Sequence, residues 1–314
     1  MLQMFRRSIA ALTLAGCLTA APIFAGGEDW TEDFAGAQTT AASESKDMLL
    51  DFTGSDWCGW CIKLVDEVFS KDAFKAYAKE NLVLVELDYP KNKPQSDEVK
   101  AQNAKLKDAY SIRGYPTIFL TDAKGRPYAQ TGYKRGGPEA YIKHLEELKK
   151  VRIERDKHMD AAAKVQGIEK AKHLDEALEV LGLELALAHY DATVKEIIKL
   201  DAKNEAGLKK KYDDLYTAKL LQDEMQEIMK GVRTDPKAAV EKIDKLVAKE
   251  GLPADSKQMA LAMKSQIQMF VLKDKDSAKK NLELAIAADP ESKVADQLRS
   301  ALKQHFGGEA ESQD

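Results

Sequence analysis

The sequence predicts an α/β domain over residues 46–150, with a mixed sheet and helices on both of its faces, followed by an all-α helical domain over residues 151–314. Two observations support this division. As far as residue 150, short apolar runs typical of strands alternate with amphipathic runs typical of helices. Beyond it the strand patterns end, and apolar residues recur at helical spacing among many Ala, Lys, Glu and Leu residues. A chain of 314 residues is long enough for two modest domains that each bury a core.

The elements of the first domain are predicted in the order β-α-β-α-β-β-α. The run Leu82-Val-Leu-Val-Glu-Leu-Asp88 is the clearest buried strand, and the turn at 122–125 joins two strands as a hairpin. The polar segment 89–98, which contains two prolines, is predicted to be a loop. The expected strands cover residues 48–52, 82–88, 117–121 and 126–132. The expected helices cover 61–69, 103–110 and 139–150, with a further helical turn at 73–80.

Helical patterns fill the second domain. Asp235-Pro236 and Asp289-Pro290 each resemble an N-cap followed by proline at the first helical position. Segments 197–204 and 285–292 are faintly similar and resemble the junction between tetratricopeptide-type helix pairs. Degenerate helical repeats and a plain helical bundle both remain open. Apolar residues at helical spacing are Leu174, Leu178, Leu181 and Leu185, and later Val294, Leu298, Leu302 and Phe306.

Residues 1–25 have the pattern of a signal peptide. Arg6-Arg7 precedes an apolar stretch over 9–21, and residues 23–25 resemble a signal peptidase site. The competing interpretation is a lipobox at 14–17, in which Cys17 would be lipidated as a membrane anchor. The sequence therefore predicts a periplasmic or secreted protein, or alternatively a lipoprotein facing the periplasm. Residues 26–45 are predicted to be a flexible leader with one helical turn.

Composition and cysteine count narrow the classes of function. The net charge of −4 and the lack of a basic block argue against nucleic-acid binding. Of the three cysteines, Cys17 belongs to the signal region, which leaves only Cys58 and Cys61 for the exported chain. An exported protein with a single close pair is not a scaffold held together by disulfides. The pair is therefore expected to react or to bind.

Cys58 and Cys61 stand where a predicted strand turns into a predicted helix, in the sequence Trp57-Cys-Gly-Trp-Cys61. The amino end of a helix favours a thiolate, so Cys58 is the expected nucleophile on a substrate disulfide. Cys61, one turn further and more buried, is expected to resolve the mixed disulfide. Trp60 is expected to be a partly exposed aromatic residue beside the reacting sulfur.

Metal binding, a structural bridge and protease-like chemistry suit the cysteine pair less well than disulfide exchange. A structural zinc site needs four ligands, but there is no second cysteine pair, and all five histidines lie at residue 144 or later. A purely structural disulfide between residues three apart closes too small a loop to restrict the unfolded chain much. A papain-like nucleophile needs a histidine from the helical part. No metal and no cofactor are expected.

Three separated motifs together resemble the thioredoxin-fold family over residues 46–150. They are Asp51-Phe52, then Trp57-Cys-Gly-Trp-Cys61 with Lys63, and Gly114-Tyr-Pro-Thr117. Segment 67–70, Glu-Val-Phe-Ser, resembles the periplasmic thioredoxin-like domains of bacterial disulfide reductases. The resemblance implies an enzyme, a thiol-disulfide oxidoreductase that acts on protein disulfides and exchanges electrons with a redox partner protein.

The resemblance also implies roles for residues around the pair. Pro116 is expected to follow a cis peptide bond, so that the Tyr115 backbone pairs with an extended substrate; an ordinary turn proline is the alternative. Trp57, Trp60 and Tyr115 are the expected substrate-binding residues. Asp51 is expected to be a buried catalytic proton relay for Cys61, although an extra residue in segment 53–56 leaves its direction open.

Two further acidic residues lie near the pair in the predicted fold. Glu86 on the neighbouring strand is the alternative acid or base. Asp56 is expected to oppose thiolate formation slightly, because it places a like charge near Cys58.

The sequence leaves two questions open. Reductase, oxidase and isomerase share these motifs, and the reducing direction is favoured here by segment 67–70. The alternative function is a helical scaffold or partner-binding protein, in which residues 151–314 carry the main activity and the thioredoxin-like domain is an accessory.

Overall fold

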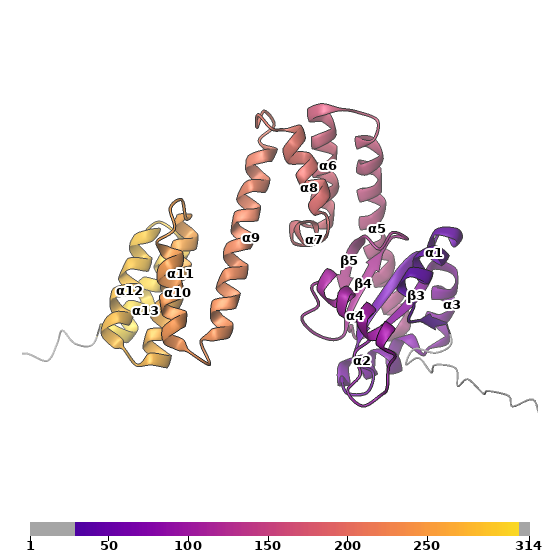
Figure 1. Cartoon of the computed structure of the whole chain (residues 1–314), viewed down its shortest axis with the longest axis horizontal. Helices are drawn as coiled ribbons and strands as arrows, with labels where there is room; N and C mark the ends of the chain where they lie inside the picture. The colour runs from indigo at the N-terminus through magenta and orange to yellow at the C-terminus, as the bar shows by residue number, and fades with distance from the viewer. Residues whose placement is uncertain (1–28, 308–314) are drawn as a thin grey trace, which may run out of the picture. The chain divides into compact units, whose positions relative to one another are not determined.

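The computed structural model describes residues 29–307 (Figure 1). The chain divides into two compact units, Met1–Ile197 and Ile198–Asp314, each described here by itself. The predicted signal peptide and Cys17 lie outside the described residues. No helix within residues 29–307 is long and apolar enough to cross a lipid bilayer.

A five-stranded mixed sheet forms the centre of the first unit, in the order β1-β3-β2-β4-β5. Strands β1, β3 and β2 run parallel, whereas β4 is antiparallel to β2 and β5 is antiparallel to β4. The predicted α/β fold is therefore confirmed. The strands are β1 (Trp30–Thr31), β2 (Asp47–Thr53), β3 (Leu82–Asp88), β4 (Thr117–Thr121) and β5 (Pro127–Thr131).

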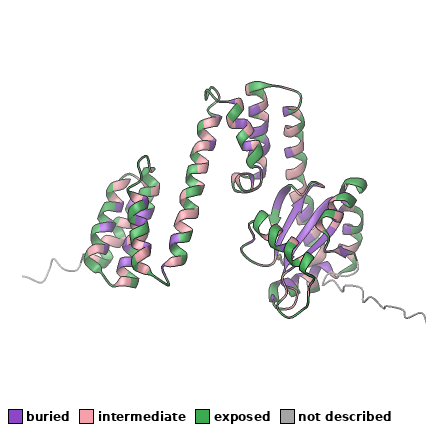
Figure 2. Cartoon of the chain, in the orientation of Figure 1, coloured by how far each residue is buried: buried purple, intermediate pink, exposed green. Residues whose placement is uncertain are grey.

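Helices cover both faces of this sheet. On one face, Leu50 and Phe52 of β2 pack with Ala37 and Ala41 of α1 and with Tyr110 after α4. The opposite face carries aromatic contacts between η1, α3 and α5. The strands are buried almost throughout (Figure 2). The helices are α1 (Phe34–Glu44), α2 (Gly59–Leu64), the π-helical turn η1 (Val65–Phe69), α3 (Asp72–Asn81), α4 (Asp97–Ala109) and α5 (Gly137–Ala162).

Two expectations about the ends of elements differ from the structure. The segment expected to be a flexible leader contains helix α1, because Asp33 caps it by accepting a hydrogen bond from the Gly36 amide at 2.9 Å, and its small residues bury against the sheet. Helix α4 begins six residues earlier than expected, because Ser96 caps it in the same way by accepting from the Val99 amide at 3.2 Å.

The first unit continues beyond the predicted boundary at residue 150, which falls inside α5. Helices α6 (Gly167–Leu181), α7 (Leu183–His189) and α8 (Asp191–Leu200) follow. Leu185 packs on the sheet core, and the His189 ring contacts the Tyr110 and Phe119 rings. The fully buried Arg155 ties α5 to the sheet, since its guanidinium pairs with Asp122 after β4. These contacts lie far apart in the sequence, which is why local periodicity does not reveal them.

The second unit consists of helices in the described residues. Asp235 caps α10 as predicted, accepting a hydrogen bond from the Ala238 amide at 3.0 Å. Asp289 instead follows the end of α12, and Ser292 caps α13, so the second cap was placed wrongly. Helical repeats stay a prediction. The elements are α9 (Leu208–Gly231), α10 (Pro236–Val247), α11 (Ala254–Gln266), the π-helical turn η2 (Ile267–Leu272), α12 (Lys275–Ala288) and α13 (Lys293–Phe306).

Candidate active site

Cys58 and Cys61 form a disulfide where β2 leads into α2, with their Cα atoms 5.2 Å apart. Cys58 is the N-cap residue of α2, and its Sγ accepts a hydrogen bond from the Cys61 amide at 3.2 Å. The exposed fraction is 7% for Cys58 and 2% for Cys61. After reduction, the sulfur of Cys58, the more exposed of the two residues, stands at the amino end of the helix, where backbone amides favour a thiolate.

The turn before Cys58 depends on a glycine. The Gly54 carbonyl accepts hydrogen bonds from the amides of Trp57 at 3.2 Å and Cys58 at 2.8 Å. A Cβ atom at Gly54 would lie 2.6 Å from the Trp57 ring. Glycine therefore allows the indole to fold back over the turn, where its Nε1–H donates to the Tyr89 carbonyl at 2.9 Å.

Two of the predicted substrate-binding residues lie together on one side of the disulfide. The ring centroids of Trp57 and Tyr115 are 5.6 Å apart, and Tyr89 lies 5.3 Å from Tyr115. The Lys91 ammonium lies over the Trp57 ring at 4.2 Å, and the Lys107 ammonium lies 5.6 Å from the Tyr115 centroid. This side of the site is therefore an aromatic surface with two cations.

The Tyr115–Pro116 peptide bond is cis, as the resemblance implies. Pro116 directly precedes β4, whose first residue, Thr117, pairs with Phe52 near the end of β2. The same end of β2 leads into the disulfide turn. The sheet register therefore brings the cis proline to the edge that carries Cys58.

A second aromatic pair lies on the dithiol helix. The Trp60 side chain is 53% exposed, and its ring lies 5.2 Å from that of Tyr133. The Lys63 ammonium lies 5.5 Å and 5.4 Å from the two ring centroids. The Tyr133 hydroxyl donates to the Glu67 carboxylate at 2.5 Å, and this bond lowers the pKa of Glu67 and raises that of Tyr133.

Sequence reasoning missed Tyr89 and Tyr133. Neither belongs to a motif, and only the sheet brings them to the disulfide. Tyr89 directly follows β3, and Tyr133 stands two residues beyond β5. An aromatic residue just past a strand end is the signal that was available.

Asp51 lies on the face of the sheet that the dithiol helix covers. Its neighbours Leu50 and Phe52 belong to the core on the opposite face, so strand alternation turns Asp51 away from that core. The side chain approaches Tyr141 of α5, whose pKa is raised first by burial and then by the Asp51 charge. Tyr141 in turn contacts Phe69 of η1, which continues the dithiol helix. Asp51 therefore lies on the sheet face that Tyr141 and Phe69 cover, despite the extra residue before Cys58.

Asp51 and Glu86, the two alternatives for the acid or base, are direct neighbours. They are paired residues on β2 and β3, and both are 4% exposed. Burial, followed by the charges of Glu86 and Asp88, raises the pKa of Asp51 well above its usual range. Asp51 Oδ1 has no hydrogen-bond partner among the described residues. The arrangement is that of a buried carboxyl group that holds a proton more readily than usual.

We expect Asp51→Asn to stabilise the protein increasingly as pH rises. The raised folded-state pKa means that wild-type Asp51 contributes its full stability only below the unfolded pKa, about 3.9. That contribution is lost as pH rises through the folded pKa, whereas asparagine does not titrate. Urea unfolding curves at pH 4 and pH 8, followed by tryptophan fluorescence, measure the difference. An equal effect at both pH values contradicts the expectation.

Asp56 has a structural role in the loop after β3. Its carboxylate accepts hydrogen bonds from the amides of Lys91 at 3.0 Å and Asn92 at 2.6 Å. These amides lower the pKa of Asp56. The carboxylate therefore holds the 91–92 segment, and Lys91 with it, beside Trp57.

An acidic cavity of about 230 Å³ opens beside the disulfide turn. Glu86 lines it, and Asp88 accepts hydrogen bonds from the amide and hydroxyl of Ser55 at 2.8 Å and 2.6 Å. Burial and the Asp88 charge raise the pKa of Glu32. The cavity thus connects the acidic neighbour of Asp51 with residues at the surface, including the exposed Lys93.

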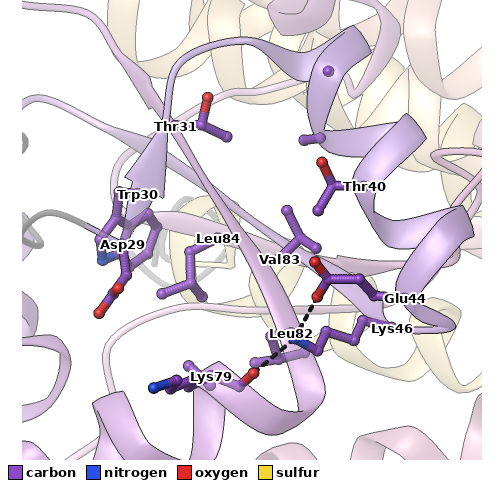
Figure 3. A pocket seen from close by; sticks show the side chains of 13 residues that line it. Asp29, Trp30, Thr31, Thr40, Glu44, Lys46, Lys79, Leu82, Val83 and Leu84 are labelled. Atoms are coloured by element: carbon purple, nitrogen blue, oxygen red, sulfur yellow. Dashed lines mark hydrogen bonds and ion pairs between the residues drawn. The ribbon is translucent and has the colours of Figure 1, made fainter.

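A larger cavity of about 520 Å³ lies at the other end of the strands (Figure 3). It is lined by residues near the start of β2 and β3, including Lys46 and Leu82. Lys46 donates to the Lys79 carbonyl at 2.7 Å and pairs with Glu44 at 2.5 Å. Because the disulfide follows the carboxyl end of β2, this cavity is not part of the site.

This chain is similar to known proteins of one family. Residues 34–149 match the thioredoxin-like domain family. The disulfide bond reductase DsbH of Chlamydia pneumoniae is 37% identical over 131 residues, which are 42% of this chain and 78% of DsbH. The thioredoxin-related protein DsbJ of the same organism is 30% identical over 103 residues, 33% of this chain and 30% of DsbJ. A solved structure of DsbH oxidoreductase covers 46% of this chain and 95% of its own, with 33% identity and a TM-score of 0.38.

Proposed function

The chain belongs to the thioredoxin-like family and is a thiol-disulfide oxidoreductase, and from this premise we propose that it is exported and reduces protein disulfides. The observation that carries the proposal is the Cys58–Cys61 pair at the start of a helix, beside Tyr115–Pro116. The likeness to a disulfide bond reductase supports the reducing direction. The signal-like pattern over 1–25 supports export to the periplasm, with the lipid anchor at Cys17 as the alternative.

The proposed reaction begins with the reduced dithiol. The Cys58 thiolate attacks one sulfur of the substrate disulfide, forms a mixed disulfide and releases the other substrate sulfur as a thiolate. The Cys61 thiolate then attacks Cys58 Sγ and releases the second substrate sulfur. The Cys58–Cys61 disulfide is the oxidised product of this turnover. A redox partner protein supplies two electrons for the next turnover.

Asp51 is the proposed proton acceptor for Cys61. Its raised pKa allows it to take the thiol proton and hold it in a buried setting. Glu86, paired with it across β2 and β3, lines the acidic cavity and offers the proton a route to solvent.

We expect Asp51→Asn to slow the second step by about tenfold or more, because a positioned proton-transfer group contributes at least that much. The first step, attack by Cys58, should be nearly unchanged. Stopped-flow tryptophan fluorescence with a disulfide-containing peptide separates the two steps. The matched control is Asp66→Asn, which removes an exposed carboxylate from η1. Equal rates in the two variants exclude Asp51 as the relay.

The test of direction is the equilibrium of the purified dithiol with glutathione. A reductant is expected to have a reduction potential below about −200 mV, closer to thioredoxin than to the strong oxidants near −120 mV. A potential near −120 mV overturns the reducing direction. Replacing both cysteines by serine tests the enzyme itself: if insulin reduction persists, the dithiol is not the reductant and the proposed enzyme function fails. A partner pull-down that depends only on residues 151–314 favours the helical scaffold instead.

Export is tested by cell fractionation. A chain carrying residues 1–25 is expected in the periplasmic fraction, and a Cys17→Ala variant distinguishes lipid anchoring from ordinary cleavage. Unchanged distribution and mass in that variant argue against the anchor.

A further inference from the structure

Two histidines and one glutamate meet between α5 and α6, away from the sequence motifs of the dithiol. His158 Nδ1 and His173 Nδ1 each lie 2.9 Å from the same oxygen, Oε2 of Glu176. One potential ligand atom from each of the three residues lies within 4.8 Å of the other two. This is a convergence of three donors on one point, and nothing in the proposed redox reaction uses it.

The fold holds this cluster in place. Helices α5 and α6 pack closely as a hairpin joined by residues 163–166, and the small residues Ala162 and Ala171 are buried there, with exposed fractions of 1% and 0%. His173 and Glu176 are three residues apart, so they share one face of α6. The side chains of His158 and His173 are 24% and 32% exposed. The cluster is thus partly shielded but reachable from solvent.

We propose that His158, His173 and Glu176 bind a divalent transition-metal cation of the zinc class. Imidazole and carboxylate donors suit Zn²⁺ and Cu²⁺, whereas Mg²⁺ and Ca²⁺ prefer oxygen ligands alone. Zinc bonds of about 2.0–2.1 Å separate tetrahedral ligands by about 3.4 Å, so the present 2.9 Å contacts need to widen by only about half an ångström. Three protein donors leave the fourth position for water.

Charges around the cluster are compatible with a cation. The cation beside His173 in the sequence, Lys172, is paired with Glu169 at 2.8 Å, so that its charge is balanced. Coordination through Nδ1 requires each histidine to be neutral, with its proton on Nε2.

A bound ion would link the end of α5 to α6. Since such a ligand binds the folded state, it is expected to stabilise the hairpin that extends the first unit beyond the sheet. No metal was expected from the sequence because only an ion held by the cysteine pair was considered. The pattern His173-x-x-Glu176 was the available signal, but its third member comes from another helix.

The test uses the tag-free exported chain with its Cys58–Cys61 disulfide intact, so that no thiolate competes for the ion. Isothermal titration with Zn²⁺ is expected to show one saturable site, with no comparable heat from Mg²⁺. His173→Ala and Glu176→Gln are each expected to weaken binding by more than about tenfold, because even loss of an outer partner of a metal ligand costs that much. The matched control, Glu169→Gln, removes a carboxylate from the same helix and is expected to bind normally.

Thermal unfolding supplies an independent measurement. Zn²⁺ is expected to raise the Tm of the wild type and of Glu169→Gln, and chelator is expected to reverse the shift. Circular dichroism without metal verifies that each variant is folded. The proposal is overturned if wild-type chain binds no Zn²⁺ saturably, if Mg²⁺ binds equally well, or if His173→Ala and Glu176→Gln bind as tightly as Glu169→Gln.

Discussion

Cys58→Ser is expected to lower the rate of disulfide reduction by about 10³-fold or more, to the uncatalysed background. Only a thiolate attacks a disulfide at a useful rate, and a serine hydroxyl at this position does not ionise at neutral pH. The amino end of α2 activates the sulfur of Cys58, and no other cysteine except Cys61 lies within the described residues. The measurement is turbidimetric insulin reduction with dithiothreitol as electron donor, corrected for the reaction without protein.

Cys61→Ser is the matched variant, since it also removes one sulfur from the pair. It is expected to retain the attack by Cys58 but to accumulate the mixed disulfide, because the resolving thiolate is absent. Mass spectrometry after acid quenching identifies the adduct on Cys58. An adduct in Cys58→Ser would reverse the assigned roles of the two cysteines. Fast turnover in Cys61→Ser would mean that Cys61 is not the resolving thiol.

Arg155→Met is expected to destabilise the first unit by about 3 kcal/mol, because it leaves buried polar groups without their charged partner. The Arg155 guanidinium is fully buried and donates to Asp122 at 3.1 Å, to Tyr190 at 2.7 Å and to Asp156 at 2.6 Å. The Tyr190 hydroxyl donates in turn to the Pro127 carbonyl of β5 at 2.9 Å. The network joins α5 and the start of α8 to the sheet.

Urea unfolding followed by tryptophan fluorescence measures the loss of stability of the first unit. All three tryptophans lie at residue 60 or earlier, so tryptophan fluorescence reports on the first unit alone. Lys157→Met, two residues further along α5, is the control: its exposed pair with Glu154 contributes at most about 1 kcal/mol. Equal effects of the two substitutions would mean that the buried network does not stabilise the unit.

Local patterns predicted most of the α/β part. The strand at 82–88 and the strand at 117–121 agree with β3 and β4, because alternating or continuous apolar runs reflect burial on a sheet directly. Sequence patterns were less informative about where helices begin and about helices without a clear apolar face. Helix α1 was missed because alanine, threonine and serine carry little amphipathic signal, and its cap and burial depend on the finished fold.

The residues of the candidate site also divide into those that the sequence predicted and those that only the fold brings together. The disulfide pair and the cis proline were predicted, since each belongs to a short motif. The sequence left Asp51 and Glu86 as alternatives, whereas the parallel register of β2 and β3 places them side by side. The aromatic neighbours Tyr89 and Tyr133 belong to no motif and approach the disulfide only through the sheet.

Local sequence patterns specify the fold class, the dithiol and its place at the start of a helix. These features depend on residues close together in the chain, where spacing alone specifies the geometry. The folded chain is needed to show which sheet face Asp51 occupies, which tyrosines flank the disulfide, how far the first unit extends and which histidines meet Glu176. Each of those depends on contacts between distant segments, and packing free energy rather than local propensity selects such contacts.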